Sequence, residues 1–341
     1  MKNTIVIILV MVIISACATA SQKADAPPEW LNNPYATYPE QLYLASIGSG
    51  DSRAQAERNA AAKLAQIFET SVSVDETHRQ RYKEITGSEL MSFEDEFSMD
   101  RSVRLEAEQT LINITYADSY RDNMGKVHVL AYIHRMRTAD IYENKIAENA
   151  DKVNQLIAQS NNSGNQLIKY AAMNAAQAVA NSNQILIDQL SIISPDSKEF
   201  LNLNYNMNSI NQRVGELARD ITFEIEIEND DNNQISILLS DMLNELGFMI
   251  TTHGMLLIDG KIDFEETDLG RADGVVFVRY DLQLRVIDDY GNIIISMNER
   301  GREGHNNFRE ARQRCLRTIQ QKIDQALQNR LISYFDNLVA S

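Results

Sequence analysis

Cysteine, proline and tryptophan are scarce in this chain. Its 341 residues include two cysteines, five prolines and one tryptophan. So few cysteines cannot build the disulfide framework that stabilises small secreted modules. A chain of this length can instead bury hydrophobic cores of its own. We therefore expect separate domains that are stabilised by packing.

Basic residues are in the minority. The chain has 32 lysines and arginines against 48 aspartates and glutamates, which gives a net charge of −16. A surface of this sign repels nucleic acid and anionic lipid head groups. We predict no nucleic-acid partner, and any membrane attachment must come from apolar groups.

Long hydrophobic runs are also lacking, except at the start. Residues 5–14 are all apolar and follow Lys2. The run is about half as long as a helix that spans a bilayer. A basic start, a short apolar core and small residues behind it are typical of a secretory signal. We expect residues 1–16 to be removed rather than folded.

The residues behind this run, Ile-Ser-Ala-Cys at 14–17, resemble the lipobox of bacterial lipoproteins. The resemblance implies that the thiol of Cys17 takes a diacylglycerol and that cleavage leaves Cys17 as the N-terminus. Ordinary cleavage is the alternative, because residues 16–18 and 18–20 both fit the small-x-small rule. Lipidation is favoured, because the spacing from the apolar core is right and only one other cysteine exists.

A lipid on Cys17 would decide where the protein lies. Two fatty chains, such as palmitate, hold a protein stably in a membrane where one is marginal. Residues 17–27, which end in a proline pair, are expected to form an extended tether. Ala18, in place of an aspartate, implies sorting to the outer membrane, with the folded part facing the periplasm.

Residues 28–137 are predicted to form a first domain. Apolar residues at 42–47 predict a strand, and a capping box at Ser52 predicts that a helix follows. The intervening Gly48 and Gly50 could belong to a dinucleotide site, but Arg53 occupies the place of the third glycine. A strand-to-helix turn explains both glycines, and we predict no cofactor.

A β-hairpin with one buried face is predicted further along, because apolar residues alternate on both sides of a turn at 122–125. His128 and His134 fall on the opposite register, which favours exposed positions over metal ligands. Carboxylates at 94–96 lack a ligand-spaced loop and favour a solvated surface. We predict no metal site.

Together these features resemble the lipoprotein-20 family, mainly over residues 28–137. The resemblance depends on the order and spacing of four features: Pro28-Glu29-Trp30, residues 43–52, the helix 54–68 and the hairpin that ends at Arg135. It implies a compact α+β domain and a role in envelope assembly, motility or surface exposure. The family supplies no catalytic residues.

Residues 138–220 are predicted to be helical. Apolar residues recur at helical spacing on both sides of a Ser-Asn-Gly loop at 160–164, which predicts an antiparallel helical hairpin. Pro195 should end it, because the residue before a proline disfavours the helical conformation. A third helix has an apolar stripe from Met207 to Ile221. Two interpretations stay open: a spacer or interaction arm, and simple packing against one domain.

Residues 221–341 are predicted to form a second domain. Strands are expected at 222–227, 255–264, 275–287 and 293–295, with a helix at 235–246. A closing helix from Phe308 to Leu338 should cover the strand 275–287 along much of its length and bury Cys315. The predicted fold is α+β: two small helix-on-antiparallel-sheet domains joined by a helical hairpin arm.

Glu303 and His305 are the most enzyme-like pair in the sequence. A carboxylate and an imidazole two residues apart on a strand share a face and could share a proton. No serine, cysteine or second carboxylate is placed by the sequence to complete a nucleophile relay. We predict no catalytic residue.

Three functions remain in competition. The favoured one is a non-enzymatic outer-membrane lipoprotein, anchored by Cys17, that binds other envelope proteins or copies of itself. The second is a regulatory binding module for a peptidoglycan synthase or a cell-wall polymer, by analogy with the order of elements in the second domain. The third is a hydrolase that uses Glu303 and His305.

Overall fold

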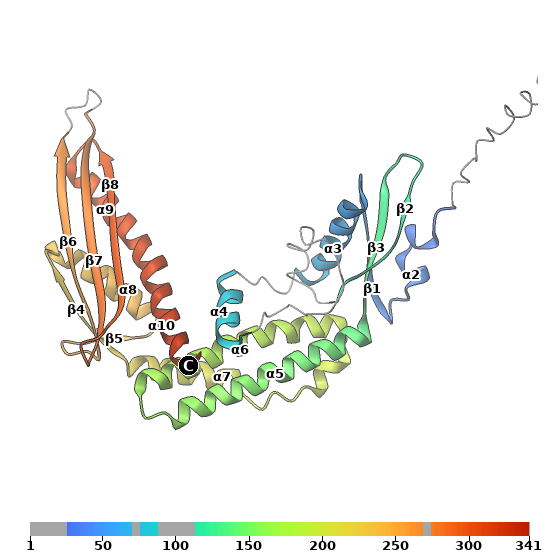
Figure 1. The fold of residues 1–341 in the computed structure, drawn as a ribbon, viewed down its shortest axis with the longest axis horizontal. Coiled ribbons are helices and arrows are strands. Elements are labelled where there is room, and N and C mark those ends of the chain that lie inside the picture. Colours follow the sequence, from blue (N-terminus) through green and yellow to red (C-terminus); the bar gives the residue numbers. More distant parts are fainter. Residues whose placement is uncertain (1–25, 70–75, 88–112, 269–273, 341) are drawn as a thin grey trace, which may run out of the picture. The chain divides into compact units, whose positions relative to one another are not determined.

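The computed structural model describes residues 26–69, 76–87, 113–268 and 274–340 (Figure 1). Helices and strands are both abundant, and the predicted α+β class is confirmed. The described residues form two compact units. The first draws on 1–67 and 98–134, and the second draws on 68–97 and 135–341.

The first unit is built on a three-stranded antiparallel sheet. Its strands lie in the order β1, β3, β2, so that β3 is central. Their bounds are Tyr43–Gly50 for β1, Thr115–Arg121 for β2 and Val127–His134 for β3. The β2–β3 hairpin turns where the sequence predicts, because Asp122 Oδ1 accepts from the backbone N–H groups of Met124 and Lys126, each at 2.9 Å.

Helix α3, Arg53–Glu69, packs on one face of this sheet. Its start is capped as predicted, since Ser52 Oγ accepts from the N–H of Gln55 at 3.3 Å. In a capping box the side chain of Gln55 would accept in return from the N–H of Ser52. Here it accepts instead from the N–H of Asp51, one residue earlier. Small and apolar side chains fill the contact: Ala56, Ala60, Ala61, Leu64 and Ala65 are buried.

The opposite face of the sheet is covered by the chain segment that precedes it. Trp30 in the 3-10 helix η1 (Glu29–Leu31) packs against Ala45 and Leu130, and tyrosines from the short helix α2 (Pro34–Thr37) and its flank surround them. The prediction that the hairpin has only one buried face is therefore wrong. The alternation of residues on β3 does not indicate that a distant segment covers the second face.

The second unit contains the predicted helical hairpin. Helices α5 (Arg135–Asn162) and α6 (Gln166–Ile193) each have 28 residues and pack along one another. At 1.5 Å per residue each is about 42 Å long. Asn165 begins α6 by accepting from the N–H groups of Leu167 and Ile168, and Pro195 follows its end as predicted. Helices α7 (Met207–Arg219) and α4 (Glu76–Thr86) pack on α6.

A five-stranded sheet completes this unit, in the order β5, β4, β6, β7, β8. The bounds are Thr222–Glu228 for β4, Met249–Ile250 for β5, Leu256–Asp268 for β6, Val276–Asp288 for β7 and Ile293–His305 for β8. The last three strands pair antiparallel, as expected. The sheet differs from the prediction at its other edge, where β4 runs parallel to both β5 and β6. The helix α8 (Gln234–Glu245) supplies the crossover that parallel strands require.

The closing helix changes its chief partner part-way along its length. Helix α9, Phe308–Lys322, packs on β7 and β8 and buries Cys315. A π-helical segment, Ile323–Leu327, then leads into α10, Gln328–Ala340, which packs chiefly on α6 and α4. The π-helical segment interrupts the single helix that the sequence predicts, and α10 also packs on helices that the sequence did not indicate, although its Arg330 still donates to the Ser296 carbonyl oxygen of β8. A continuous apolar stripe does not indicate that the helix changes its partner.

Candidate functional site

The predicted lipidation residue, Cys17, lies outside the described residues, as do the signal and most of the tether. The carboxylate run at 94–96 also lies outside them. Their assignments stay predictions. Among helices that the structure does describe, none combines the length and apolarity needed to cross a membrane.

Gly48 and Gly50 allow α3 to pack closely on β1. A Cβ atom on Gly48 would lie 2.1 Å from both the carbonyl oxygen of Ala56 and the nitrogen of Ala60. Real Cβ contacts are not that short, so the residue must be glycine for α3 to lie on β1. The two glycines belong to β1 itself, where α3 occupies the space beside them.

Both histidines of β3 are engaged by side chains of the first unit. His128 Nε2 lies 2.9 Å from Asp122 Oδ2, and this hydrogen bond lowers the pKa of Asp122. The ring of His134 meets the ring of Tyr43 edge-on, with centroids 5.0 Å apart. Over the ranges that the structure describes, no three His, Cys, Asp or Glu side chains gather in a way that could hold a metal ion.

Glu303 and His305 do share one face at the end of β8, as predicted from the sequence. Glu303 Oε1 accepts a hydrogen bond of 2.9 Å from Thr318 Oγ1, which ties the carboxylate to α9. The nearby thiol is that of Cys315, which contacts the carbonyl oxygen of Val278 at 3.4 Å. Burial raises the pKa of this thiol to about 11. A neutral thiol is a poor nucleophile, and the contacts of Thr318 and Cys315 hold α9 on the sheet.

The five-stranded sheet has an open edge, which the sequence analysis did not predict. Strand β5 pairs with β4 only at Thr222 and Phe223, while β4 pairs with β6 as far as Glu228. From Glu224 onward β4 is therefore bonded on one side only. We call residues 224–228 the open edge.

Local geometry keeps β5 short and holds α8 beside the open edge. Gly247, at a φ of +85°, ends α8 and turns the chain into β5. Gly254 then passes so close to β4 that a Cβ atom would lie 2.4 Å from Glu224 N. At the other end, Asp230 caps α8 by accepting from the N–H groups of Ile235 and Ser236, at 2.9 and 2.8 Å. Both ends of α8 are thus fixed.

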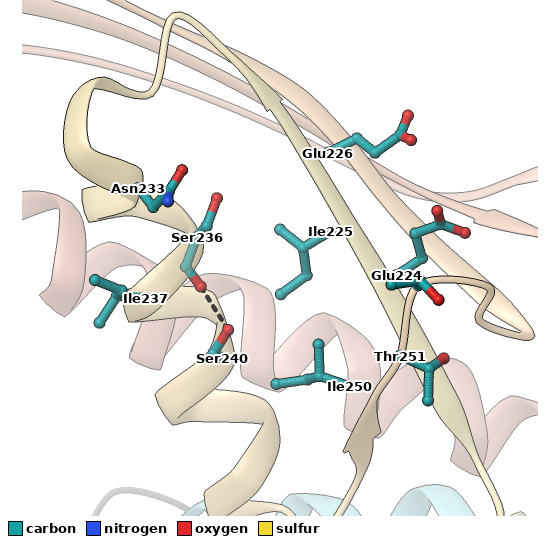
Figure 2. A pocket seen from close by; sticks show the side chains of 10 residues that line it. Glu224, Ile225, Glu226, Asn233, Ser236, Ile237, Ser240, Ile250 and Thr251 are labelled. Atoms are coloured by element: carbon teal, nitrogen blue, oxygen red, sulfur yellow. Dashed lines mark hydrogen bonds between the residues drawn. The ribbon is translucent and has the colours of Figure 1, made fainter.

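A hollow of about 470 Å³ lies between α8 and the open edge. Figure 2 shows Ile225 and Ile250 in the space between the helix and the strand, with Glu224 and Glu226 on the other side of β4. One large apolar side chain of its lining is unusually exposed, Ile237 at 53%. The lining is completed by polar groups of small side chains: Asn233, Ser236, Ser240, Thr251 and Thr252. The hollow is therefore apolar beside α8 and acidic across the strand.

The sequence did contain one sign of this edge. Glu224, Glu226 and Glu228 occupy alternate positions of β4, as charged residues on an edge strand do. The same alternation fits any strand with one wet face, so it indicates a half-buried strand without its place in the sheet.

Residues 28–134 match the LPP20 lipoprotein family. The matched segment includes β1, α3, β2 and β3, which is the part of the chain where the sequence resembles this family. The resemblance is therefore confirmed for this segment, which is about a third of the chain. The LPP20 match supports a lipoprotein of the cell-envelope type.

Solved structures give more distant likenesses. The secreted protein HP1454 from the human pathogen Helicobacter pylori is 12% identical, with 85% of this chain and 97% of that chain covered at a TM-score of 0.41. A minor lipoprotein from Acinetobacter baumannii is 13% identical, with 34% of this chain and 92% of that chain covered at a TM-score of 0.25. No curated protein sequence matches the chain.

Proposed function

We propose that this protein is a non-enzymatic lipoprotein of the bacterial outer membrane, anchored through Cys17 and facing the periplasm. Its role is structural or in assembly, and its folded units bind other envelope components. One observation carries the proposal: the LPP20 segment begins at residue 28, directly behind a short tether and a lipobox cysteine. A fold held at the membrane by a short tether is suited to contact neighbouring envelope proteins.

A regulatory binding module for a peptidoglycan synthase or a cell-wall polymer is the second candidate. The open edge favours it, because an unpaired strand beside an apolar hollow is a common peptide-binding arrangement. The hydrolase interpretation has less support, since Thr318 engages Glu303 and burial keeps the Cys315 thiol neutral.

Cross-linking in intact envelopes tests the proposal. The wild-type chain should give discrete cross-linked products with envelope proteins or with itself, and a synthase among them would favour the second candidate. Cys17→Ala is the matched control, since a chain released from the membrane should lose these products. Wild-type and Cys17→Ala chains that both give no product would contradict an assembly role.

A further inference from the structure

We infer that the open edge of β4 binds an extended polypeptide segment in which apolar and basic side chains alternate. The segment adds to the sheet as a further strand. This inference names the chemistry of a partner and does not depend on the lipid anchor.

The backbone of β4 has the groups that an added strand needs. The carbonyl oxygens of Ile221 and Phe223 accept from Met249 N and Thr251 N on the β5 side, at 3.2 and 2.8 Å. Residues at alternate positions of a strand present their backbone groups to the same side. Ile225 and Ile227 therefore present N–H and C=O groups to the open side, and within the described residues neither pairs with β5.

The side chains beside the open edge set the pattern of the segment. Successive side chains of an added strand point to opposite faces of the sheet. On the α8 face they would meet Ile225, Ile237 and Ile250, which favours apolar side chains. On the opposite face they would meet Glu224 and Glu226. Neither carboxylate forms an ion pair within the described part of the chain, so lysine or arginine would find a partner there.

The same charges disfavour a second copy as the occupant. Two β4 edges paired with one another would place glutamates of both strands on the same face, and like charges opposite one another destabilise a sheet. The charge of the edge thus prevents self-pairing and remains complementary to a basic segment.

Binding can be measured with the full chain in detergent and a fluorescein-labelled peptide that alternates valine and lysine. Fluorescence anisotropy gives the dissociation constant. Amide hydrogen exchange followed by NMR should show slower exchange at Ile225 and Ile227 in the complex, which is specific to strand addition. A peptide of the same composition with its lysines grouped together, and the alternating peptide N-methylated throughout, should both bind much more weakly.

The protein variants separate local recognition from net charge. Glu224→Gln with Glu226→Gln should weaken binding about tenfold, because both charges beside the segment are lost. Asp140→Asn with Asp151→Asn removes the same amount of charge from exposed positions on α5. This variant should leave the dissociation constant of the peptide nearly unchanged. Because neither experiment requires lipid, a failure here would leave the anchor of Cys17 untouched.

Any of four results would overturn the inference. If the α5 variant weakened peptide binding as much as the β4 variant, the peptide would be attracted by net charge alone. Equal binding of the N-methylated peptide, or no binding of the alternating one, would exclude strand addition. Protection of Ile225 and Ile227 without peptide, together with a dimer in sedimentation, would assign the edge to a second copy.

Discussion

Gly48 and Cys315 show how single residues position α3 and α9 on their sheets. The backbone of Ala56 and Ala60 occupies the space that a side chain at position 48 would need. The thiol at position 315 is fully buried against β7, where it contacts the backbone of Val278. Each residue is small because a helix lies directly on a strand at that point.

Gly48→Ala should destabilise the first unit by about 2 to 4 kcal/mol, because α3 or β1 must shift to admit one methyl group. Trp30, the only tryptophan, packs in this unit, so its fluorescence during guanidinium unfolding reports on it. Gly164→Ala is the control, since nothing lies within 4 Å of its added Cβ atom. A Gly48→Ala transition that coincides with the wild-type transition would show that α3 is not held against β1.

Cys315 should resist a water-soluble thiol reagent until denaturant is added. Burial raises the pKa of its thiol from an ordinary value near 9 to about 11, so the folded chain keeps a proton that the unfolded chain releases. Stability should therefore fall between about pH 9 and pH 11 in a chain with Cys315, relative to Cys315→Ala. Both experiments use a Cys17→Ala background. Rapid labelling of the native protein would contradict the buried position.

At the scale of elements, polar contacts fix α4 within the second unit. Arg81 donates to both carboxylate oxygens of Asp336 on α10, at 2.9 and 3.0 Å, and to Asn174 on α6 at 2.6 Å. The neighbouring Tyr82 donates to Asn149 on α5 at 2.5 Å. Asp336 is only 3% exposed, and burial raises its pKa although Arg81 opposes the shift.

Arg81→Met should lower the free energy of unfolding by about 3 to 5 kcal/mol near neutral pH, because it leaves a buried carboxylate without its cation. The difference in stability from wild type should shrink as the pH falls, since protonation of Asp336 removes the unpaired charge. Thermal unfolding followed by circular dichroism gives the comparison. Adding Asp336→Asn should recover part of the loss, and a double variant no better than Arg81→Met would argue against an unpaired charge as the cause.

The elements that the sequence predicted well are those set by local signals. The helical hairpin follows from apolar residues spaced along α5 and α6 and from the loop at 160–164, and the turn at Asp122 follows from its own side-chain hydrogen bonds. The errors concern contacts between distant segments. Burial of both faces of β3, the parallel pairing of β4 and the shift of α10 onto α6 and α4 all depend on segments far along the chain.

The candidate site was missed for the same reason. The residues of β4 fit a half-buried strand, but whether that strand is central or at an edge depends on how far β5 pairs with it. After β5 the chain passes so close to β4 that a side chain at Gly254 would meet the backbone of Phe223 and Glu224. Sequence periodicity contains no information on such a close approach.

At the scale of the whole molecule, we propose a lipidated N-terminus ahead of two folded units. The LPP20 segment at 28–134 supplies the first unit, and the second unit adds the helical hairpin and a sheet with an open edge. The net charge of −16 does not favour adsorption to anionic head groups. We therefore propose that fatty chains on Cys17 provide the membrane attachment.

The most direct test is metabolic labelling with a palmitate analogue in a double-membrane bacterium, combined with fractionation of the envelope. The wild-type chain and Cys315→Ala, which keeps Cys17, should both carry the label and sediment with the outer membrane. Cys17→Ala should carry no label and appear in the soluble fraction. A Cys17→Ala chain that is still labelled, or that remains in the membrane fraction, would contradict the central claim that Cys17 is the anchor.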